Sequence, residues 1–171
     1  MKILVLSDTH GLLDNAYKIT DKIKTEIYAI IHLGDYDRDA DTLRFKYPDL
    51  KVFSVAGNCD YSDYDNTERI INLGGVKIFM THGHTYHVNS GVMRLAYAAM
   101  EKEADIALYG HTHSAFISRE DGILIMNPGS ISSPRGTNIC SYGILDIEDG
   151  FADAKIMGIY DNGIREMKVE E

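Results

Sequence analysis

Five short clusters of acidic, amide and imidazole side chains recur along the sequence, and each contains a glycine. The clusters are Ser7-Asp8-Thr9-His10-Gly11, Gly34-Asp35, Gly57-Asn58-Cys59-Asp60, Thr81-His82-Gly83-His84 and Gly110-His111-Thr112-His113. Carboxylate and amide oxygens together with imidazole nitrogens suit Mn, Fe, Zn, Ni or Mg better than a soft metal. One carboxylate can bridge two ions that lie roughly 3.5–4 Å apart, so these residue types predict a binuclear metal site.

A single Asp-x-His or His-x-His pair is a weak signal, because such pairs are common in turns and on exposed strands. The five clusters together are a stronger signal, since each follows a segment that is predicted to be a β-strand. These segments are residues 2–6, 27–33, 51–56, 76–81 and 106–109. Open α/β sheets bind ligands at the carboxyl ends of their strands, so we expect the clusters to meet at one edge. We expect Asp8-x-His10 and His111-x-His113 to be extended, so that both side chains of each pair can reach one ion.

The remaining chain shows helix patterns in its first half and strand patterns after residue 105. A helix is predicted after the first strand, because apolar residues recur there at helical spacing (Leu12, Leu13, Ala16, Ile19 and Ile23). A second helix is predicted over 39–46. A third is predicted over 90–103, with an apolar face of Val92, Leu95, Ala96, Ala99 and Met100. Gly74-Gly75 predicts a hairpin between strands 70–73 and 76–81. Further strands are expected at 116–118, 123–126, 142–147, 154–160 and 164–169.

This pattern predicts one domain over residues 1–171, with two sheets packed face to face and helices outside. The fold class is α/β, or α+β by a stricter definition. His32 lies inside an apolar run, and we expect it to be a hydrogen-bonded core residue and not a ligand.

Composition excludes several other classes of protein. Hydrophobic residues are 44% and charged residues 25% of the chain, which is ordinary globular usage. No apolar run approaches the roughly 18–20 residues that a membrane span needs. The net charge of −9 and the lack of a basic patch disfavour nucleic acid as a partner. Two cysteines make no disulfide framework, so a cytoplasmic location is expected. An exposed patch among the eleven tyrosines would favour a homo-oligomer, either a dimer or a tetramer.

The clusters resemble those of the calcineurin-like metallophosphoesterases, and in particular their small single-domain phosphodiesterase branch. The matching motifs are Asp8-x-His10, Gly34-Asp35, Gly57-Asn58, His82 and Gly110-His111-x-His113, and the likeness extends through Asn127-Pro128-Gly129-Ser130 and Ser133-Pro134-Arg135. The resemblance implies a four-layer sandwich of two mixed β-sheets flanked by helices, with two metal ions at its edge.

Roles carried over from this family assign the metal ligands. Asp8, His10 and His113 would hold the first ion, Asn58, His82 and His111 would hold the second, and Asp35 would bridge both. Manganese is the first expectation for the two divalent ions, and nickel, iron, cobalt, zinc and magnesium are alternatives. The expected reaction is hydrolysis of a small phosphodiester by a metal-bridged hydroxide, with no nucleophile from the protein.

The sequence departs from the family at two positions. The usual Gly-Asp-x-x-Asp is not matched, because Arg38 takes its last position and Asp37 and Asp39 flank it. Cys59 stands where the family has a histidine that meets the phosphate and the leaving group. Cys59 either contributes there or is a small buried apolar residue. His84 either contacts the phosphate in its place or orders its own loop.

Three further expectations concern the surroundings of the site. Arg135 either contacts the substrate phosphate or is a solvated loop residue. The loop Tyr61-Ser62-Asp63-Tyr64-Asp65 and the segment from Tyr86 to Gly91 are expected to wall the cleft. Two alternative functions remain open. One is a catalytically weak interaction scaffold like the retromer subunit of this fold, and the other is a phosphomonoesterase or nucleotidase.

Overall fold

The first of two β-sheets combines the beginning and the end of the chain. The computed structural model describes residues 1–60 and 66–169. The sheet contains β1 (Lys2–Leu6), β2 (Ile27–His32), β3 (Lys51–Ser54), β9 (Cys140–Glu148), β10 (Phe151–Tyr160) and β11 (Gly163–Glu166), in the order β11-β10-β9-β1-β2-β3. Strand β1 lies in the middle of the sheet, parallel to β2 and antiparallel to β9.

The second sheet is built from the middle of the chain. It contains β4 (Glu68–Leu73), β5 (Val76–Thr81), β6 (Ile106–Leu108), β7 (Ala115–Glu120) and β8 (Ile123–Pro128), in the order β4-β5-β6-β8-β7. The predicted hairpin at Gly74-Gly75 is confirmed, because β4 and β5 pair with Leu73 opposite Val76. Strands β5, β6 and β8 are parallel to one another.

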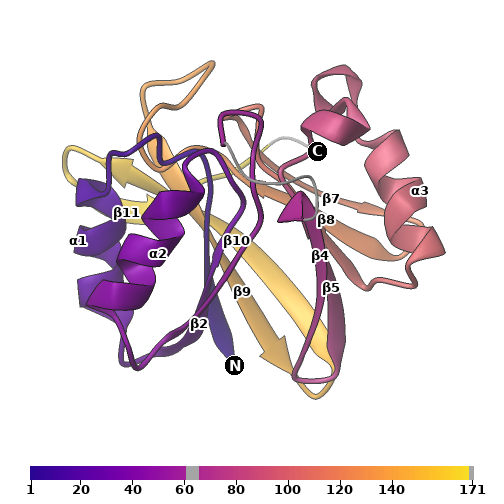
Figure 1. Cartoon of the computed structure of the whole chain (residues 1–171), viewed down its shortest axis with the longest axis horizontal. Coiled ribbons are helices and arrows are strands. Elements are labelled where there is room, and N and C mark those ends of the chain that lie inside the picture. Colours follow the sequence, from indigo (N-terminus) through magenta and orange to yellow (C-terminus); the bar gives the residue numbers. More distant parts are fainter. Residues whose placement is uncertain (61–65, 170–171) are drawn as a thin grey trace.

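Helices cover the outer face of each sheet, as Figure 1 shows. Helices α1 (Asp14–Ile23) and α2 (Asp37–Lys46) lie on the first sheet, and α3 (Met93–Glu101) lies on the second. The arrangement is a four-layer α/β sandwich of two mixed sheets between helices, which confirms the predicted fold. Among the described residues, no helix combines the length and apolar character that crossing a membrane requires.

Strand β1 shows why its sequence is almost continuously apolar. Alternate side chains of a strand point to opposite faces of the sheet. Ile3 and Val5 are fully buried in the core between the two sheets, whereas Leu4 and Leu6 are fully buried against α1 and α2. Both faces of β1 are therefore covered, as expected for a strand in the parallel part of a sheet.

Several predicted element boundaries were wrong. The helix predicted at 90–103 begins only at Met93, because Val88–Ser90 forms a short 3₁₀ turn and Gly91 has a φ of 118°. Met100 is 44% exposed and lies off the buried face, to which Ala98 belongs instead. Leu12 precedes α1 and is 61% exposed. The last strand ends at Glu166 and not at residue 169.

Candidate metal centre

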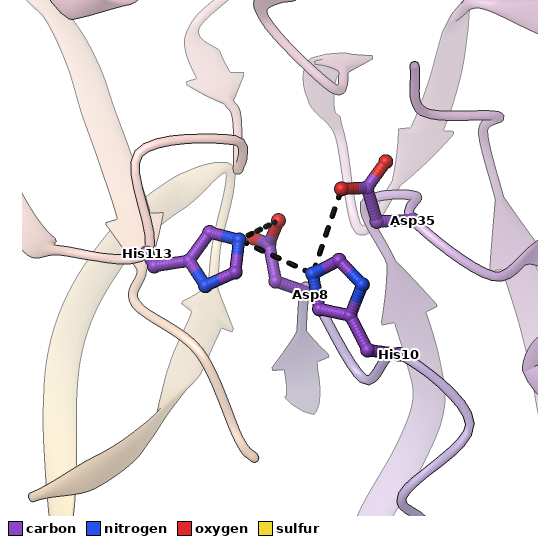
Figure 2. Close-up of side chains that lie close together, drawn as sticks. All are labelled: Asp8, His10, Asp35 and His113. Carbon is purple, nitrogen blue, oxygen red and sulfur yellow. Dashed lines mark hydrogen bonds and ion pairs between the residues drawn. The ribbon is translucent and has the colours of Figure 1, made fainter. Parts of the chain in front are cut away.

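The first group of candidate ligands consists of Asp8, His10, Asp35 and His113. One ligand atom from each lies within 4.8 Å of the others. His113 Nε2 is 3.2 Å from Asp8 Oδ1 and 3.2 Å from His10 Nε2, and His10 Nε2 is 3.6 Å from Asp35 Oδ2. Figure 2 shows the four side chains converging on one point from loops that follow different strands. The predicted first-site residues are therefore brought together.

The hydrogen bonds of His113 indicate what this point can hold. His113 Nδ1 donates to the carbonyl of Ser133 at 2.6 Å, so Nε2 of the neutral ring carries a lone pair. That lone pair faces the Asp8 carboxylate, whose Oδ1 is buried and has no hydrogen-bond partner among the described residues. Burial lowers the pKa of His113 and raises the pKa of Asp8 to about 7. A cation between these atoms would satisfy both, so the donor set fits a metal ion.

The second group repeats this arrangement around His82. His82 Nδ1 donates to the carbonyl of Leu33 at 2.7 Å, which turns Nε2 toward Asp35 Oδ1 at 3.3 Å and Asn58 Oδ1 at 3.2 Å. Burial lowers the pKa of His82 to about 4, so its ring is neutral near pH 7. Two oxygen acceptors thus face a nitrogen lone pair, which again fits a metal ion.

Asp35 lies between the two groups. Its Oδ2 atom faces His10 and its Oδ1 atom faces His82. The side chain is buried, and Oδ1 also accepts a hydrogen bond from the backbone N–H of Cys59 at 3.0 Å. A carboxylate with one oxygen toward each histidine group has the arrangement that a bridging ligand requires.

His111 lies at the outer side of the second group. Its ring centroid is 5.2 Å from that of His82, and its Nε2 accepts a hydrogen bond from the exposed Asn89 amide at 3.0 Å. The backbone N–H of His111 donates to Asp8 Oδ2 at 3.2 Å. The segment from Tyr86 to Gly91 therefore contacts the candidate site through Asn89, while residues 61–65, the other expected wall, lie outside the described residues.

The expected extended conformation of the paired motifs was wrong. Asp8, His10, His111 and His113 all have positive φ, between 48° and 68°. This left-handed conformation turns the chain sharply, so the alternation of an extended strand does not determine which side chains meet. As a result, His113 joins Asp8 and His10, whereas His111 lies beside His82.

Glycines let the loops approach one another closely. A Cβ atom at Gly110 would lie 2.0 Å from Ser7 Oγ, and one at Gly57 would lie 2.2 Å from Asp35 Oδ1. These separations are far below van der Waals contact, so a larger residue at either position would displace a candidate ligand loop.

Asp60 has a structural role that the sequence analysis missed. Its Oδ1 accepts hydrogen bonds from the backbone N–H groups of Tyr36 at 2.7 Å and Asp37 at 2.8 Å, and its Oδ2 accepts one from Gly57 at 2.7 Å. Asp60 therefore ties the loop that carries Asp35 to the loop that carries Asn58. The available signal was an aspartate at the end of a turn-like Gly-Asn-Cys-Asp segment, where such side chains bond to nearby backbone.

Two other buried residues accept hydrogen bonds from the backbone of the candidate ligand loops. Asp39 is buried and accepts a hydrogen bond from the backbone N–H of Gly11 at 2.9 Å, so Asp39 and not Asp37 supports the His10 loop. His32 is fully buried, contacts Thr9 Oγ1 at 2.9 Å and accepts from the Gly34 N–H at 3.3 Å. The prediction that His32 is a hydrogen-bonded core residue is confirmed.

Cys59 is exposed, so the interpretation of this residue as a buried apolar side chain was wrong. The Asn58 amide donates to its Sγ at 3.5 Å. Desolvation and the neighbouring Asp35 raise the pKa of the thiol to about 11, so the thiol stays protonated near pH 7. The backbone turns here because the Cys59 N–H bonds to Asp35, which leaves the side chain outside the core.

His84 and Arg135 lie at the margin of the candidate site. The His84 ring centroid is 5.5 Å from that of His82 and 6.1 Å from that of His111, and burial lowers the pKa of His84. His84 Nδ1 is buried and has no hydrogen-bond partner among residues 1–60 and 66–169. Arg135 is exposed, and its backbone N–H donates to the carbonyl of His113 at 3.1 Å.

Comparisons with known proteins agree with this geometry. Residues 1–150 match the model of the calcineurin-like phosphoesterase superfamily domain. The chain is 34% identical over 169 residues to a "probable metallophosphoesterase" of Bacillus subtilis, with 98% of this chain and 95% of that protein covered. It is 31% identical over 163 residues to a phosphodiesterase of Methanocaldococcus jannaschii, with 86% of this chain and 94% of that protein covered.

Solved structures show the same architecture. A predicted phosphoesterase from Streptococcus pneumoniae superposes with a TM-score of 0.79 at 33% identity, covering 97% of this chain and 96% of that one. Vps29 from Chaetomium thermophilum superposes with a TM-score of 0.81 at 18% identity, covering 99% of this chain and 97% of that one. The second likeness, at this identity, concerns the fold alone.

Proposed function

The chain belongs to the calcineurin-like phosphoesterase superfamily, and from this membership we propose that it is a metal-dependent phosphodiesterase that acts on small phosphodiesters. The observation that carries the proposal is the position of Asp35, with one carboxylate oxygen toward His10 and the other toward His82. Relatives named as phosphodiesterases in Methanocaldococcus jannaschii and Escherichia coli support the same activity.

In this proposal the two groups of residues described above hold two divalent ions. Asp8, His10 and His113 hold the first, Asn58, His82 and His111 hold the second, and Asp35 is shared. Two such ions supply Lewis acidity that activates water and offsets charge on the phosphoryl oxygens. The chain fixes the ligands in advance, because Ser133 and Leu33 accept the Nδ1 protons of His113 and His82 and thereby direct both Nε2 atoms inward.

Cys59 makes the proposed reaction depend on the acidity of the leaving group. A neutral thiol with a pKa of about 11 is a much weaker acid than an imidazolium and carries no positive charge, so it is a poor replacement for histidine in donating a proton to a departing alkoxide. Phosphodiesters with acidic leaving groups, such as aryl diesters, need no such proton. Alkyl monoesters need it and also bring an additional negative charge, so they are expected to be slow.

The first experiment measures metal and activity together. The purified protein is stripped, reloaded with Mn, Ni, Co, Zn or Mg in turn, and assayed on bis(p-nitrophenyl) phosphate and on an alkyl phosphomonoester. Manganese is the first choice in this proposal. We expect about two metal equivalents and clear diester turnover. Faster hydrolysis of the monoester would favour the phosphomonoesterase or nucleotidase alternative. Absence of both metal binding and turnover would favour an interaction scaffold of the same fold.

A second experiment tests the role of Cys59. Diesters of graded leaving-group pKa are compared for the wild type and for Cys59→His, with Cys59→Ala as the control for packing. The wild type should slow steeply as the leaving group becomes more basic, and Cys59→His should recover part of a gap of about 10²–10⁴-fold. Cys59→Ala should stay within about tenfold of the wild type on aryl diesters. If the wild-type rate does not depend on the leaving-group pKa, another group donates the proton, and His84 is the first residue to test.

A further inference from the structure

Tyr36 presents an exposed aromatic ring beside the candidate metal centre. It directly follows Asp35 and stands at the start of α2, with 45% of its surface exposed. Its backbone is left-handed, with φ 78° and ψ 69°. Large L-residues rarely adopt this conformation, and where they do the surrounding structure must enforce it.

The conformation of Tyr36 is enforced from two sides. Asp60 Oδ1 accepts the backbone N–H of Tyr36 at 2.7 Å and fixes the turn. The ring packs edge-on against His10, with ring centroids 5.8 Å apart. It also lies over Gly11, where a Cβ atom would be 3.5 Å from Tyr36 Cε1. The ring therefore occupies a defined place next to a ligand of the first group.

Packing of the core does not explain this placement. Tyr36 belongs to none of the three buried apolar clusters. The hydrogen bond between Tyr36 and Asp60 uses the backbone N–H of Tyr36 and does not involve the ring. The fold thus holds a large, partly exposed aromatic side chain in an unfavourable backbone conformation beside His10 and Gly11. Such local strain tends to occur where a residue serves a function.

We propose that Tyr36 determines substrate specificity by forming a platform for a flat aromatic substituent on the phosphoryl group. This inference rests on the proposed phosphodiesterase function and adds the substrate class, namely phosphate esters that carry an aryl or heteroaromatic group. With the phosphoryl group held by the ions that Asp35 and His10 would bind, an aromatic substituent directed toward Tyr36 would contact its partly exposed ring. Aromatic rings pack favourably in offset or edge-to-face geometry, so this contact selects aromatic over small aliphatic groups.

The test compares binding of two simple phosphonates to the manganese-loaded protein by isothermal titration calorimetry. Phenylphosphonate and methylphosphonate present the same charged group and differ only in the organic substituent, at a pH where both are dianions. We expect the wild type to bind phenylphosphonate about two- to tenfold more tightly than methylphosphonate. Tyr36→Asn should bring the ratio of the two affinities to about one, because asparagine tolerates the left-handed backbone but has no ring.

Two further variants serve as controls. Tyr36→Phe keeps the ring and should retain the preference. Tyr97→Ala removes a tyrosine that is 56% exposed on α3 and should behave as the wild type. The proposal is overturned if the wild type shows no preference, or if Tyr36→Asn keeps it while metal content stays normal. Absence of bis(p-nitrophenyl) phosphate turnover by the manganese-loaded wild type would instead count against the phosphodiesterase proposal itself and remove both together.

Discussion

The two halves of the candidate metal centre differ in how completely the chain has assembled them. In the first group, one ligand atom from each of Asp8, His10, Asp35 and His113 already lies within 4.8 Å of the others. In the second group, His82 faces Asp35 and Asn58, but the Nε2 atom of His111 is hydrogen-bonded to Asn89. Asn58 is also exposed, whereas Asp8 is fully buried.

This difference indicates that the first ion should bind more tightly than the second. Preorganised ligands bind without further ordering, whereas the second group must first release His111 from Asn89. In both groups a hydrogen bond from Nδ1 already directs the Nε2 lone pair of one histidine, His113 or His82, toward the candidate site. The difference between the groups therefore lies in His111, whose Nε2 is hydrogen-bonded to Asn89. We therefore expect two separate binding steps when manganese is titrated into the stripped protein, and the variants below test whether each step belongs to the assigned group.

The largest effect is expected for Asp35→Asn, which would remove the distinction between the two groups by disabling both. A neutral amide cannot hold two dications close together, so both binding steps should weaken. Loss of one electrostatic contact to a transition state reduces turnover by about 10²–10³-fold, so a loss of two should reduce diester turnover by about 10⁴-fold or more. Metal analysis and the diester assay measure this. Near-wild-type turnover with full metal content would contradict a shared bridging ligand.

The pair His113→Ala and His111→Ala should separate the two steps. His113→Ala should remove the tight binding step, and His111→Ala should remove the weak one. Each variant should lower the affinity for its ion by at least about a hundredfold, because the loss of a residue that only hydrogen-bonds to a metal ligand already lowers metal affinity by about 10–100-fold. Calorimetric titration with manganese gives both steps, and circular dichroism checks that the fold is intact. Loss of the same step in both variants would show that the two histidines serve one ion.

Asp60→Asn should weaken the second group more than the first. Asp60 connects the Asp35 loop to the Asn58 loop, and within residues 1–60 and 66–169 it forms no hydrogen bond or ion pair with Asp8 or His113. An amide cannot accept with both of its terminal atoms, so at least one of the three backbone N–H groups loses its partner. We expect the weak step to fall by about 10–100-fold and the tight step to change less. Equal losses in both steps would mean that Asp60 supports the two groups alike.

The smallest effect is expected for Asn89→Ala. The Asn89 amide holds His111 Nε2, and this hydrogen bond must break before His111 can bind a metal ion. A hydrogen bond has a net value of about 0.5–1.5 kcal/mol, so its removal should tighten the weak step by about two- to tenfold. The tight step should not change. Weaker binding of the second ion in this variant would show that Asn89 positions His111 for the ion and does not compete with it.

The sequence predicted the location of the candidate site better than its local geometry. Strand ends could be placed from apolar runs such as Lys2–Leu6, and their carboxyl ends meet at one edge as a matter of sheet geometry. His32 could be assigned to the core because it interrupts an apolar run. The left-handed backbone at His10 and His111 could not be predicted, since it depends on tertiary contacts that no local pattern encodes.

Contacts between distant loops were the other limit. The hydrogen bonds of Asp60 to Tyr36 and Asp37 join residues 24 and 23 positions apart, and sequence spacing carries no sign of them. The exposure of Cys59 also depends on such a contact, because its N–H bonds to Asp35 on a neighbouring loop. The choice between Asp37 and Asp39 depends on a contact of the same kind, because Asp39 accepts the N–H of Gly11, 28 positions away in the sequence.

The central place of β1 has a consequence for the order in which the molecule is made. Lys2 pairs with Ile27 on one side and with Asp146 on the other, and Ser130 and Ser132 donate to the carbonyl of Asp8. Ribosomes add about 5–20 residues per second, so the first strand waits many seconds for its second neighbour. A nascent chain that ends before Ser130 leaves one edge of β1 unpaired and the Asp8 loop without its serine contacts. Metal loading is therefore expected to follow release of the finished chain, and a truncated product would expose an apolar strand edge to aggregation or to chaperones.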